Sequence, residues 1–275
     1  MFIIALVKNG AATGLKILNV AVALRSNYTV TRDIAYASAA HQTLDIYAPK
    51  NIDKKLPVIV FYFGGGWSWG DKSYFAFVAD SFVEKGYVVV IPNYVLYPEG
   101  KYPQFVTDGA KAIAWVNRNI ERYEGDIKQL NIVGHSAGAY IGAMVSFNDK
   151  YLASQGSNTS IIHKFAGIAG PYNFTPKAQE YIDIFGKENF VDMKIENHVS
   201  GNEPPSLLLH SEGDTTVGAF NQEKMKQALK AKQSRVETIM YGPEITHIKI
   251  LLKLHPWFAG EVDVGKDINN FLKGP

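Results

Sequence analysis

The pentapeptide Gly-His-Ser-Ala-Gly at residues 134–138 is the sequence feature that most restricts how this chain can fold. It follows the β-rich run of residues 130–133 and precedes a small-residue helical pattern over residues 137–146. Glycine on both sides of the serine lets a strand and a helix approach without a Cβ clash, and the tight turn between them exposes the hydroxyl. The pentapeptide therefore predicts a strand-turn-helix unit with Ser136 at its turn, as a candidate nucleophile.

Apolar runs and helical spacing alternate along the rest of the chain. A continuous apolar run is typical of a strand covered on both faces, and apolar residues three or four positions apart are typical of a helix. Strands are expected at residues 57–63, 87–92, 130–133, 164–169, 206–210 and 236–241, and helices at residues 74–85, 108–123, 137–146, 220–232 and 264–272. Runs at residues 33–37 and 43–48 alternate apolar and polar side chains, which predicts an antiparallel pair. This order predicts an α/β fold with a mostly parallel central sheet and helices on both faces.

The segment of residues 171–205 interrupts the alternation. It is rich in Pro, Asn and Gly and contains one helical piece, at residues 177–185. In open α/β folds, ligands bind beyond the carboxyl ends of the strands, and an insertion there can cover the site. We expect one domain over residues 29–275 with a small cap or lid at residues 171–205, and an ordinary surface excursion is the alternative.

Residues 1–28 form an apolar segment that precedes the domain. Two interpretations stay open: a signal peptide or anchor, since Ala21-Val22-Ala23 resembles a cleavage site, or an amphipathic helix that docks on the domain or on a membrane surface. The apolar run of residues 15–24 is too short and too polar to span a bilayer. The compartment, cytoplasmic or exported to a periplasm, is left open by both interpretations.

Composition excludes several classes of protein. With 47% hydrophobic and 20% charged residues, the chain is typical of a globular protein rather than a disordered one. The formal net charge of +2 gives no reason to expect a nucleic-acid partner. There is no cysteine, which rules out disulfides, thiolate metal sites and a cysteine nucleophile, and we expect neither a metal nor a cofactor.

A serine hydroxyl is a weak nucleophile near neutral pH, so Ser136 needs a histidine to remove its proton and a carboxylate to orient that histidine. The predicted strand at residues 206–210 ends just before Glu212 and Asp214. We assign the orienting carboxylate to Asp214, which turn-forming residues follow, and keep Glu212 as the alternative.

The candidate base lies further along the chain. Only His247 and His255 follow Asp214. His247 occupies the loop between the last predicted strand and the final helix, so it is the preferred general base. The order Ser136, Asp214, His247 is the order that such a fold requires.

Acyl transfer also needs hydrogen-bond donors aimed at the developing oxyanion. The glycine-rich loop that follows the predicted strand at residues 57–63 offers the backbone amides of Gly65 and Gly66, and the elbow offers that of Ala137. Aromatic side chains near these loops are candidates to line a substrate pocket, although each could equally pack in the core: Trp67, Trp69, Tyr97 and Tyr172.

Taken together, these stretches resemble the α/β-hydrolase superfamily, in its carboxylesterase and hormone-sensitive-lipase-like branch, which includes small feruloyl esterases and kynurenine formamidase. Residues 63–72, Phe-Gly-Gly-Gly-Trp-Ser-Trp-Gly-Asp-Lys, are similar to the oxyanion loop of that branch, His-Gly-Gly-x-Trp followed by Gly-Asp-Lys. Residues 93–99, Asn-Tyr-Val-Leu-Tyr-Pro-Glu, are similar to its Tyr-Arg-Leu-x-Pro-Glu segment. The resemblance implies an α/β-hydrolase fold over about residues 30–273.

Two positions depart from the branch pattern. Phe63 stands where the loop usually begins with histidine, so a side-chain hydrogen bond that would brace the loop is absent. Val95 replaces an arginine, which removes an ion-pair anchor beneath the loop. Because the oxyanion donors are backbone groups, we still expect an oxyanion hole.

The resemblance implies a serine hydrolase that cleaves small or short-acyl carboxylic esters through an acyl-enzyme. An arylformamidase or a peptidase would use the same residues, and a non-catalytic binding module of the same fold is an alternative from another class. The apolar N-terminus also allows a lipase that works at a membrane surface. The expected partner is a small-molecule ester, with membrane-surface association through the N-terminus left open.

Overall fold

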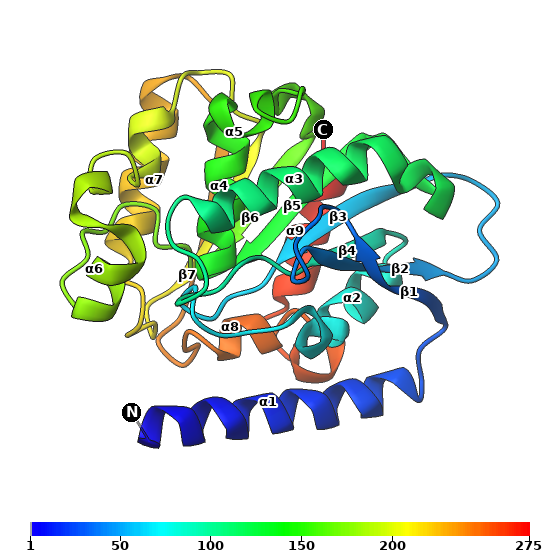
Figure 1. The fold of residues 1–275 in the computed structure, drawn as a ribbon. Helices are drawn as coiled ribbons and strands as arrows, with labels where there is room; N and C mark the ends of the chain where they lie inside the picture. Colours follow the sequence, from blue (N-terminus) through cyan, green and yellow to red (C-terminus); the bar gives the residue numbers. More distant parts are fainter. Residues whose placement is uncertain (1) are drawn as a thin grey trace.

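The computed structural model describes residues 2–275 and has the predicted α/β-hydrolase architecture (Figure 1). One sheet runs in the order β1-β2-β4-β3-β5-β6-β7-β8. β2 pairs antiparallel with β1 and β4, and every other neighbouring pair is parallel. The strands are β1 (Tyr28–Ala35), β2 (Thr43–Pro49), β3 (Leu56–Tyr62), β4 (Val88–Pro92), β5 (Gly125–His135), β6 (Lys164–Ile168), β7 (Ser206–Ser211) and β8 (Val236–Tyr241).

Helices follow the strands in the predicted order. The α-helices are α1 (Phe2–Ala23), α2 (Ala76–Val83), α3 (Gln104–Asn119), α4 (Ala137–Phe147), α5 (Asp149–Ala153), α6 (Gln179–Phe185), α7 (Phe220–Ala231), α8 (Lys249–Leu252) and α9 (Val264–Lys273). The 3-10 helices are η1 (Lys72–Phe75), η2 (Ile120–Tyr123), η3 (Thr159–Ile161), η4 (Lys187–Asn189), η5 (Ile195–His198) and η6 (Pro256–Phe258).

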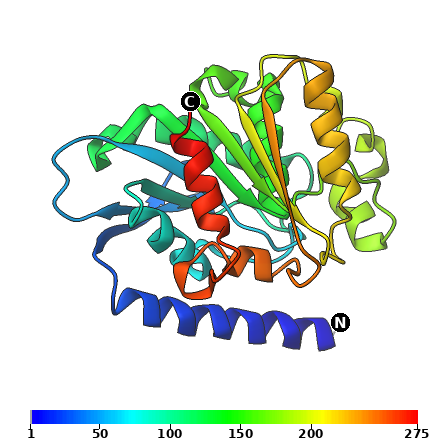
Figure 2. The same ribbon diagram turned by 180° about the vertical axis from the view of Figure 1, so that it is seen from behind.

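The helices form a layer on each face of the sheet. Figure 1 shows α3, α4 and α5 over the front face, and Figure 2, from behind, shows α9 over the other, where α2 also packs. The central strands are buried on both faces, and residues 58–62 of β3 have no exposed surface. This burial explains why the central strands read as continuous apolar runs rather than as alternating ones.

Several elements begin earlier than their patterns indicate. β1 begins at Tyr28, because a register shift between Thr31 and Ile34, with Asp33 at φ 56°, breaks its apolar-polar alternation. α3 begins at Gln104, and its first turn is anchored by the buried side chains of Phe105 and Val106. Local irregularity of this kind changes which side chains face the core, and periodicity alone does not reveal it.

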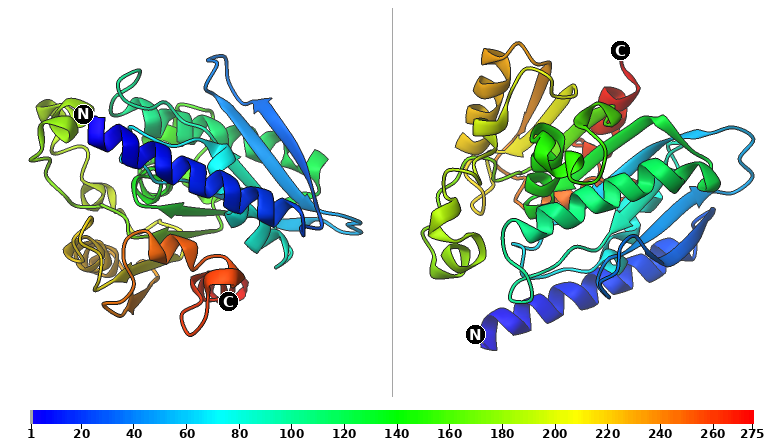
Figure 3. Two further views of the ribbon diagram at one scale, coloured as in Figure 1. Left: turned by 90° about the horizontal axis from the view of Figure 1, so that it is seen from below. Right: turned by 45° about the horizontal axis from the view of Figure 1, so that its top comes forward.

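Helix α1 lies along one side of the domain, against η1 and α2 (Figure 3). The Asn19 side chain ties it down: Nδ2 donates to the Ser73 carbonyl oxygen (2.8 Å), and Oδ1 accepts from the Phe77 amide (2.9 Å). Met1 and the side chains of residues 2–9 and 11, part of the predicted apolar segment, lie outside the described residues. Within the described part of the chain, no helix has the length and hydrophobicity needed to cross a bilayer.

Candidate active site

Ser136 occupies a strained turn between β5 and α4. Its backbone has φ 54° and ψ −123°, a conformation that side-chain-bearing residues rarely adopt. The flanking glycines make the turn fit: a Cβ on Gly138 would lie 2.0 Å from the Tyr62 carbonyl oxygen, and one on Gly134 would lie 2.5 Å from the Gly138 carbonyl oxygen. Neither position has room for a side chain, which agrees with the prediction that both glycines allow the strand and the helix to approach each other closely.

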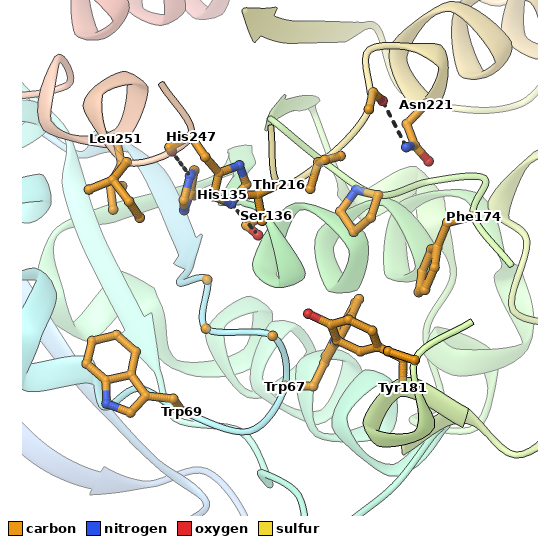
Figure 4. Close-up of a pocket in the computed structure, with 18 of the residues that line it drawn as sticks. Trp67, Trp69, His135, Ser136, Phe174, Tyr181, Thr216, Asn221, His247 and Leu251 are labelled. Carbon is orange, nitrogen blue, oxygen red and sulfur yellow. Dashed lines mark hydrogen bonds between the residues drawn. The ribbon is translucent and has the colours of Figure 1, made fainter. Parts of the chain in front are cut away.

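The three residues expected to act together meet at the carboxyl edge of the sheet, and Figure 4 shows two of them, Ser136 and His247. The Ser136 hydroxyl lies 2.9 Å from Nε2 of His247, and Nδ1 of His247 lies 2.7 Å from Oδ2 of Asp214. Ser136 follows β5, Asp214 follows β7, and His247 follows β8. The arrangement is that of a nucleophile, a base and the carboxylate that orients the base.

Asp214 is held as a charged carboxylate. Its second oxygen, Oδ1, accepts hydrogen bonds from the amides of Thr216 (2.8 Å) and Val217 (2.9 Å). Burial alone would raise the pKa of Asp214, but the hydrogen bond from His247 and those from the two amides outweigh burial and lower it. A carboxylate that stays ionised keeps the proton of His247 on Nδ1, which leaves Nε2 free to accept the serine proton.

The alternative residues lie elsewhere. Glu212 is exposed, and its amide donates to the Tyr241 carbonyl oxygen at the end of β8. His255 is buried and pairs with a carboxylate far from Ser136, since its Nε2 lies 3.1 Å from Oδ2 of Asp80. Neither residue is placed to assist Ser136.

The loop after β3 places free amides next to Ser136. Gly65 has φ 142° and Gly66 has φ 60°, and a Cβ on Gly65 would lie 1.8 Å from the Trp69 carbonyl oxygen. Within residues 2–275, the amides of Gly65, Gly66 and Ala137 donate to no protein acceptor. Glycine is required at residue 65 because the loop folds back on itself there, and the three amides are available to a ligand oxygen.

An aromatic stack takes the place of the histidine that usually begins this loop. The Phe63 ring lies between Phe75 (5.0 Å between centroids, 6° between planes) and Tyr94 (4.7 Å, 25°). The Tyr94 hydroxyl also donates to the Phe63 carbonyl oxygen (2.9 Å). The stack therefore braces the first residue of the loop by packing and by one hydrogen bond to the backbone.

Other partners replace the arginine that is absent at residue 95, and one of them is the Lys111 ammonium, which lies 3.6 Å from Oδ1 of Asp108. Asp108, the carboxylate beneath this region, accepts from the Val95 amide (3.1 Å) and from Nε2 of Gln42 (2.6 Å), and it lies 2.8 Å from Nε2 of His41. His41 and Gln42 lie just before β2, far from the motif in sequence. No sequence pattern therefore predicts that His41 and Gln42 contact Asp108.

Asp71 and Lys72 fasten the far end of the loop. Asp71 accepts from the Ser73 backbone amide through Oδ1 and from the side-chain Nδ2 of Asn93 through Oδ2 (2.9 Å each). The Lys72 ammonium lies 2.7 Å from Oδ1 of Asp45, whose side chain is fully buried in β2, and also contacts Asp33. Burial alone would lower the pKa of Lys72, but the two carboxylates raise it, so the ammonium stays charged.

A cavity of about 1340 Å³ opens over Ser136 and His247. Trp67 and Trp69 line it, as the sequence suggested (Figure 4). Tyr97 and Tyr172 do not lie on its wall, and that part of the expectation is corrected. Tyr172 is buried, and its ring covers the backbone of Gly167 and Gly170; Tyr97 instead binds the Trp67 carbonyl oxygen through its own amide (2.8 Å).

His135, in the variable position of the elbow, supports the base rather than reacting. Its Nε2 donates to the His247 carbonyl oxygen (3.0 Å), which holds the loop that carries the base. Burial, followed by the proximity of His247, lowers the pKa of His135 to about 3. His135 is therefore neutral near pH 7.

The cavity also has walls from outside the strand-helix alternation. Leu15 and Leu18 of α1 and Phe174 and Tyr181 of the segment at residues 171–205 all line it. Helical spacing could show that α1 has an apolar face, but not what that face covers. Among residues 2–275, no cluster of three or more His, Cys, Asp or Glu side chains is placed to hold a metal ion.

Comparison with known proteins gives concordant matches. Residues 44–229 match the family model BD-FAE. The isoprenylcysteine alpha-carbonyl methylesterase ICME of Arabidopsis thaliana is 27% identical over 91% of this chain and 64% of its own length. The kynurenine formamidase of Salmo salar is 30% identical over 81% of this chain and 76% of its own length. This chain thus spans less than two thirds of the methylesterase.

Solved structures show the same fold. A truncated carbohydrate esterase from gut microbiota superposes with a TM-score of 0.78 at 18% identity, covering 90% of this chain and 96% of its own. An inhibited esterase B from Lactobacillus rhamnosis superposes with a TM-score of 0.79 at 17% identity, and the match covers 98% of this chain and 96% of the esterase chain.

The buried Lys72 ion pair predicts a large effect on stability. Lys72→Met removes the buried cation from the Asp45 carboxylate and leaves it only the half-exposed Arg32 guanidinium (3.3 Å), so we expect the free energy of unfolding to fall by about 3 kcal/mol. Lys55→Met is the control, because Lys55 pairs with Glu121 at an exposed site and its loss should cost at most about 1 kcal/mol. Urea denaturation of both variants measures the difference, and equal losses would contradict the role of Lys72.

The lowered pKa of His135 predicts a loss of stability in mild acid. An unfolded histidine takes up a proton below pH about 6.5, and folded His135 does so only near pH 3, so the unfolded state binds more protons between these values. Stability due to this residue therefore falls by about 2 kcal/mol from pH 7 to pH 5. His135→Gln keeps an amide donor but cannot titrate, so its unfolding free energy should lose less over that range. An identical pH dependence in the two proteins would refute the assignment.

Proposed function

The chain belongs to the BD-FAE family of carboxylesterase-like α/β-hydrolases, and from that premise we propose that it hydrolyses carboxylic esters through an acyl-enzyme on Ser136. The observation that carries the proposal is the continuous hydrogen-bonded chain from the Ser136 hydroxyl through His247 to Asp214. The free amides beside Ser136 and the cavity above it support the same reaction.

In the proposed reaction, each group at the site has a defined role. Oγ of Ser136 attacks the ester carbonyl carbon while Nε2 of His247 takes the hydroxyl proton, and Asp214 stabilises the imidazolium that forms. The carbonyl oxygen becomes an oxyanion that accepts hydrogen bonds from the free amides at residues 65, 66 and 137. The tetrahedral intermediate then expels the alcohol, which takes the proton from His247. Water, deprotonated by His247, attacks the acyl-enzyme in the same way and releases the carboxylic acid.

The size of the cavity favours esters in which the acyl or the alcohol part is large. Its volume of about 1340 Å³ exceeds the ~300–1,000 Å³ typical of small-molecule sites, and its walls are mostly apolar. One relative is named an isoprenylcysteine alpha-carbonyl methylesterase, and another is named a kynurenine formamidase. We propose ester cleavage as the main activity and formamide cleavage as the second candidate, since a formamide carbonyl would meet the same groups.

Active-site labelling and a substrate panel test this proposal. A fluorophosphonate probe should label Ser136, and Ser136→Ala should lower kcat/KM for p-nitrophenyl esters by several orders of magnitude, about 10⁶-fold where a complete triad acts. Ser146→Ala is the control, because that hydroxyl bonds only to the Gly142 carbonyl oxygen within α4. The panel contains esters of graded acyl length and N-formylkynurenine. An unlabelled protein, or a Ser136→Ala variant with full activity, would favour a non-catalytic binding module.

We also propose that α1 rests on an anionic lipid surface. Leu15, Leu18 and Val22 face the domain, whereas Ile17, Val20 and Leu24 form a second apolar row that is 66%, 63% and 83% exposed. The sequence of α1 contains two lysines and no acidic residue. An exposed apolar row on a basic helix is typical of helices that lie in the plane of a membrane interface.

Vesicle binding tests the lipid proposal. Co-sedimentation with vesicles of phosphatidylcholine and phosphatidylglycerol should be strong for the wild type and at least tenfold weaker when Ile17, Val20 and Leu24 are changed to Ser. The matched control is Met240→Ser, an exposed apolar residue of the edge strand β8 that is 44% accessible. Turnover of a water-soluble ester should be equal in all three proteins. Equal sedimentation of the triple variant and the wild type would refute the proposal.

A further inference from the structure

The cavity has two chemically different ends, one on each side of Ser136 (Figure 4). Trp69 and Leu251 lie on one side, and Phe174, Tyr181 and Asn221 lie on the other. We call the first the apolar lobe; its walls are the side chains of Leu15, Leu18, Trp69, Phe75, Leu251 and Leu252. We call the second the polar lobe; its polar residues are Asn173, Lys177, Lys194, Asn221 and Lys224.

Three ammonium groups of the polar lobe lack a counter-ion. Lys177, Lys194 and Lys224 make no ion pair with any carboxylate in residues 2–275. The described wall of the cavity contains no Asp or Glu at all, and the Lys224 ammonium lies only over the Phe220 ring, 6.0 Å from its centroid. Lys230 and Lys232, outside the cavity, also make no ion pair with a described carboxylate, so the polar lobe is set apart by three such lysines on one wall that carries no acid. The polar lobe is therefore a local excess of positive charge.

The start of α7 adds to that positive potential. This helix of 12 residues has no side chain capping its first amides, and Gly218, Phe220 and Asn221 at its start line the cavity. The Phe220 amide has no acceptor in the described protein. The amino end of a helix carries partial positive charge and unsatisfied N–H groups, and it favours anions.

A buried amide in the same lobe also lacks a partner. Asn173 lines the cavity and is 4% exposed, and its Nδ2 has no acceptor among the described residues. Its backbone is fixed, because its own amide donates to Oδ1 of Asn221 (2.8 Å), and Nδ2 of Asn221 donates to the Gly218 carbonyl oxygen (3.0 Å). A buried donor without an acceptor is costly, and a rotation of this side chain toward the cavity would let a ligand oxygen remove that cost.

From these features we infer that the polar lobe binds a carboxylate of the substrate. The inference rests on the proposed esterase function and specifies its substrate class: an ester with one apolar part and a second part that carries a carboxylate several bonds from the scissile carbonyl. The apolar lobe receives the neutral part. Lys177, Lys194 and Lys224 attract the carboxylate, and the amide groups of Asn173 and α7 offer hydrogen bonds to its oxygens.

Length-matched ester pairs test the inference from the acyl side. Mono-p-nitrophenyl esters of succinate, glutarate, adipate and suberate are compared with p-nitrophenyl esters of the neutral acids of equal carbon number. For the alcohol side, 4-acetoxybenzoate is compared with its methyl ester. The wild type should prefer the anionic member of at least one pair by tenfold or more in kcat/KM at low salt, with the preference falling as salt rises.

Charge-matched variants decide whether the polar lobe causes the preference. In the variant Lys177→Met, Lys194→Met, Lys224→Met, the ratio of kcat/KM for the anionic ester to that for its neutral partner should fall at least tenfold. The control variant Lys226→Met, Lys230→Met, Lys232→Met removes the same three charges from positions outside the cavity and should keep the preference. Asn173→Asp should raise KM for the anionic ester only. No preference in the wild type, or equal loss in both triple variants, overturns the inference.

The two proposals fail in different ways. If the neutral esters are cleaved but no anionic preference exists, the esterase proposal stands and the carboxylate site does not. If no ester is cleaved, binding of the same ester pairs to Ser136→Ala by titration calorimetry decides the question: a tenfold tighter Kd for the anionic member supports the site, and equal Kd values overturn it.

Discussion

The close contact between β3, β5 and α4 is the constraint on which the whole site depends. A Cβ on Gly138 would lie 2.0 Å from the Tyr62 carbonyl oxygen, so the start of α4 touches the end of β3 directly. That contact forces Ser136 to φ 54°, and the buried packing of α4 on both strands maintains the strain. Because Ser136 cannot relax, its hydroxyl stays within 2.9 Å of the His247 ring nitrogen. The geometry of the nucleophile is therefore a result of core packing.

The loop after β3 shows that different contacts can stabilise the same backbone. Its first residue, Phe63, is held by stacking between Phe75 and Tyr94, and its far end by the buried pair of Lys72 and Asp45. Both contacts act at a distance from the amides that face the ligand. The loop can therefore lose the hydrogen bond of a histidine at residue 63 without moving the amides at residues 65 and 66, because packing enforces their positions.

The sequence predicted the parts of the site that depend on chain order at the sheet edge. Ser136, Asp214 and His247 each follow a strand of the same sheet, and the carboxyl ends of parallel strands meet at one edge, so their proximity follows from topology. The direction of a side chain does not follow from topology. Tyr172 adjoins the site in sequence, yet its ring covers Gly167 and Gly170 in the core. Contacts between distant segments, such as Gln42 with Asp108, have no local pattern at all.

Two kinds of structural element form the cavity: the edge of the sheet and segments that lie outside the sheet-and-helix core. The sheet edge carries Ser136, Asp214 and His247, whereas both lobes are walled by segments outside the strand-helix alternation: α1 on one side and residues 171–205 on the other. The second segment is firmly held. The Tyr140 hydroxyl donates to the Met193 carbonyl oxygen (2.7 Å), and the Tyr102 hydroxyl donates to Oδ2 of Asp192 (2.7 Å).

These anchors determine how the polar lobe acts on a ligand. Tyr140 belongs to α4, the helix that begins directly after Ser136, so Ser136 and the backbone that carries Lys194 are fastened to one rigid element. A lysine on an anchored backbone loses only side-chain freedom when it meets an anion, whereas a lysine on a mobile lid would also have to order its backbone at about 1–2 kcal/mol per residue. The polar lobe is thus preorganised: it selects a ligand by charge and by distance from Ser136, and binding requires no closure of the segment.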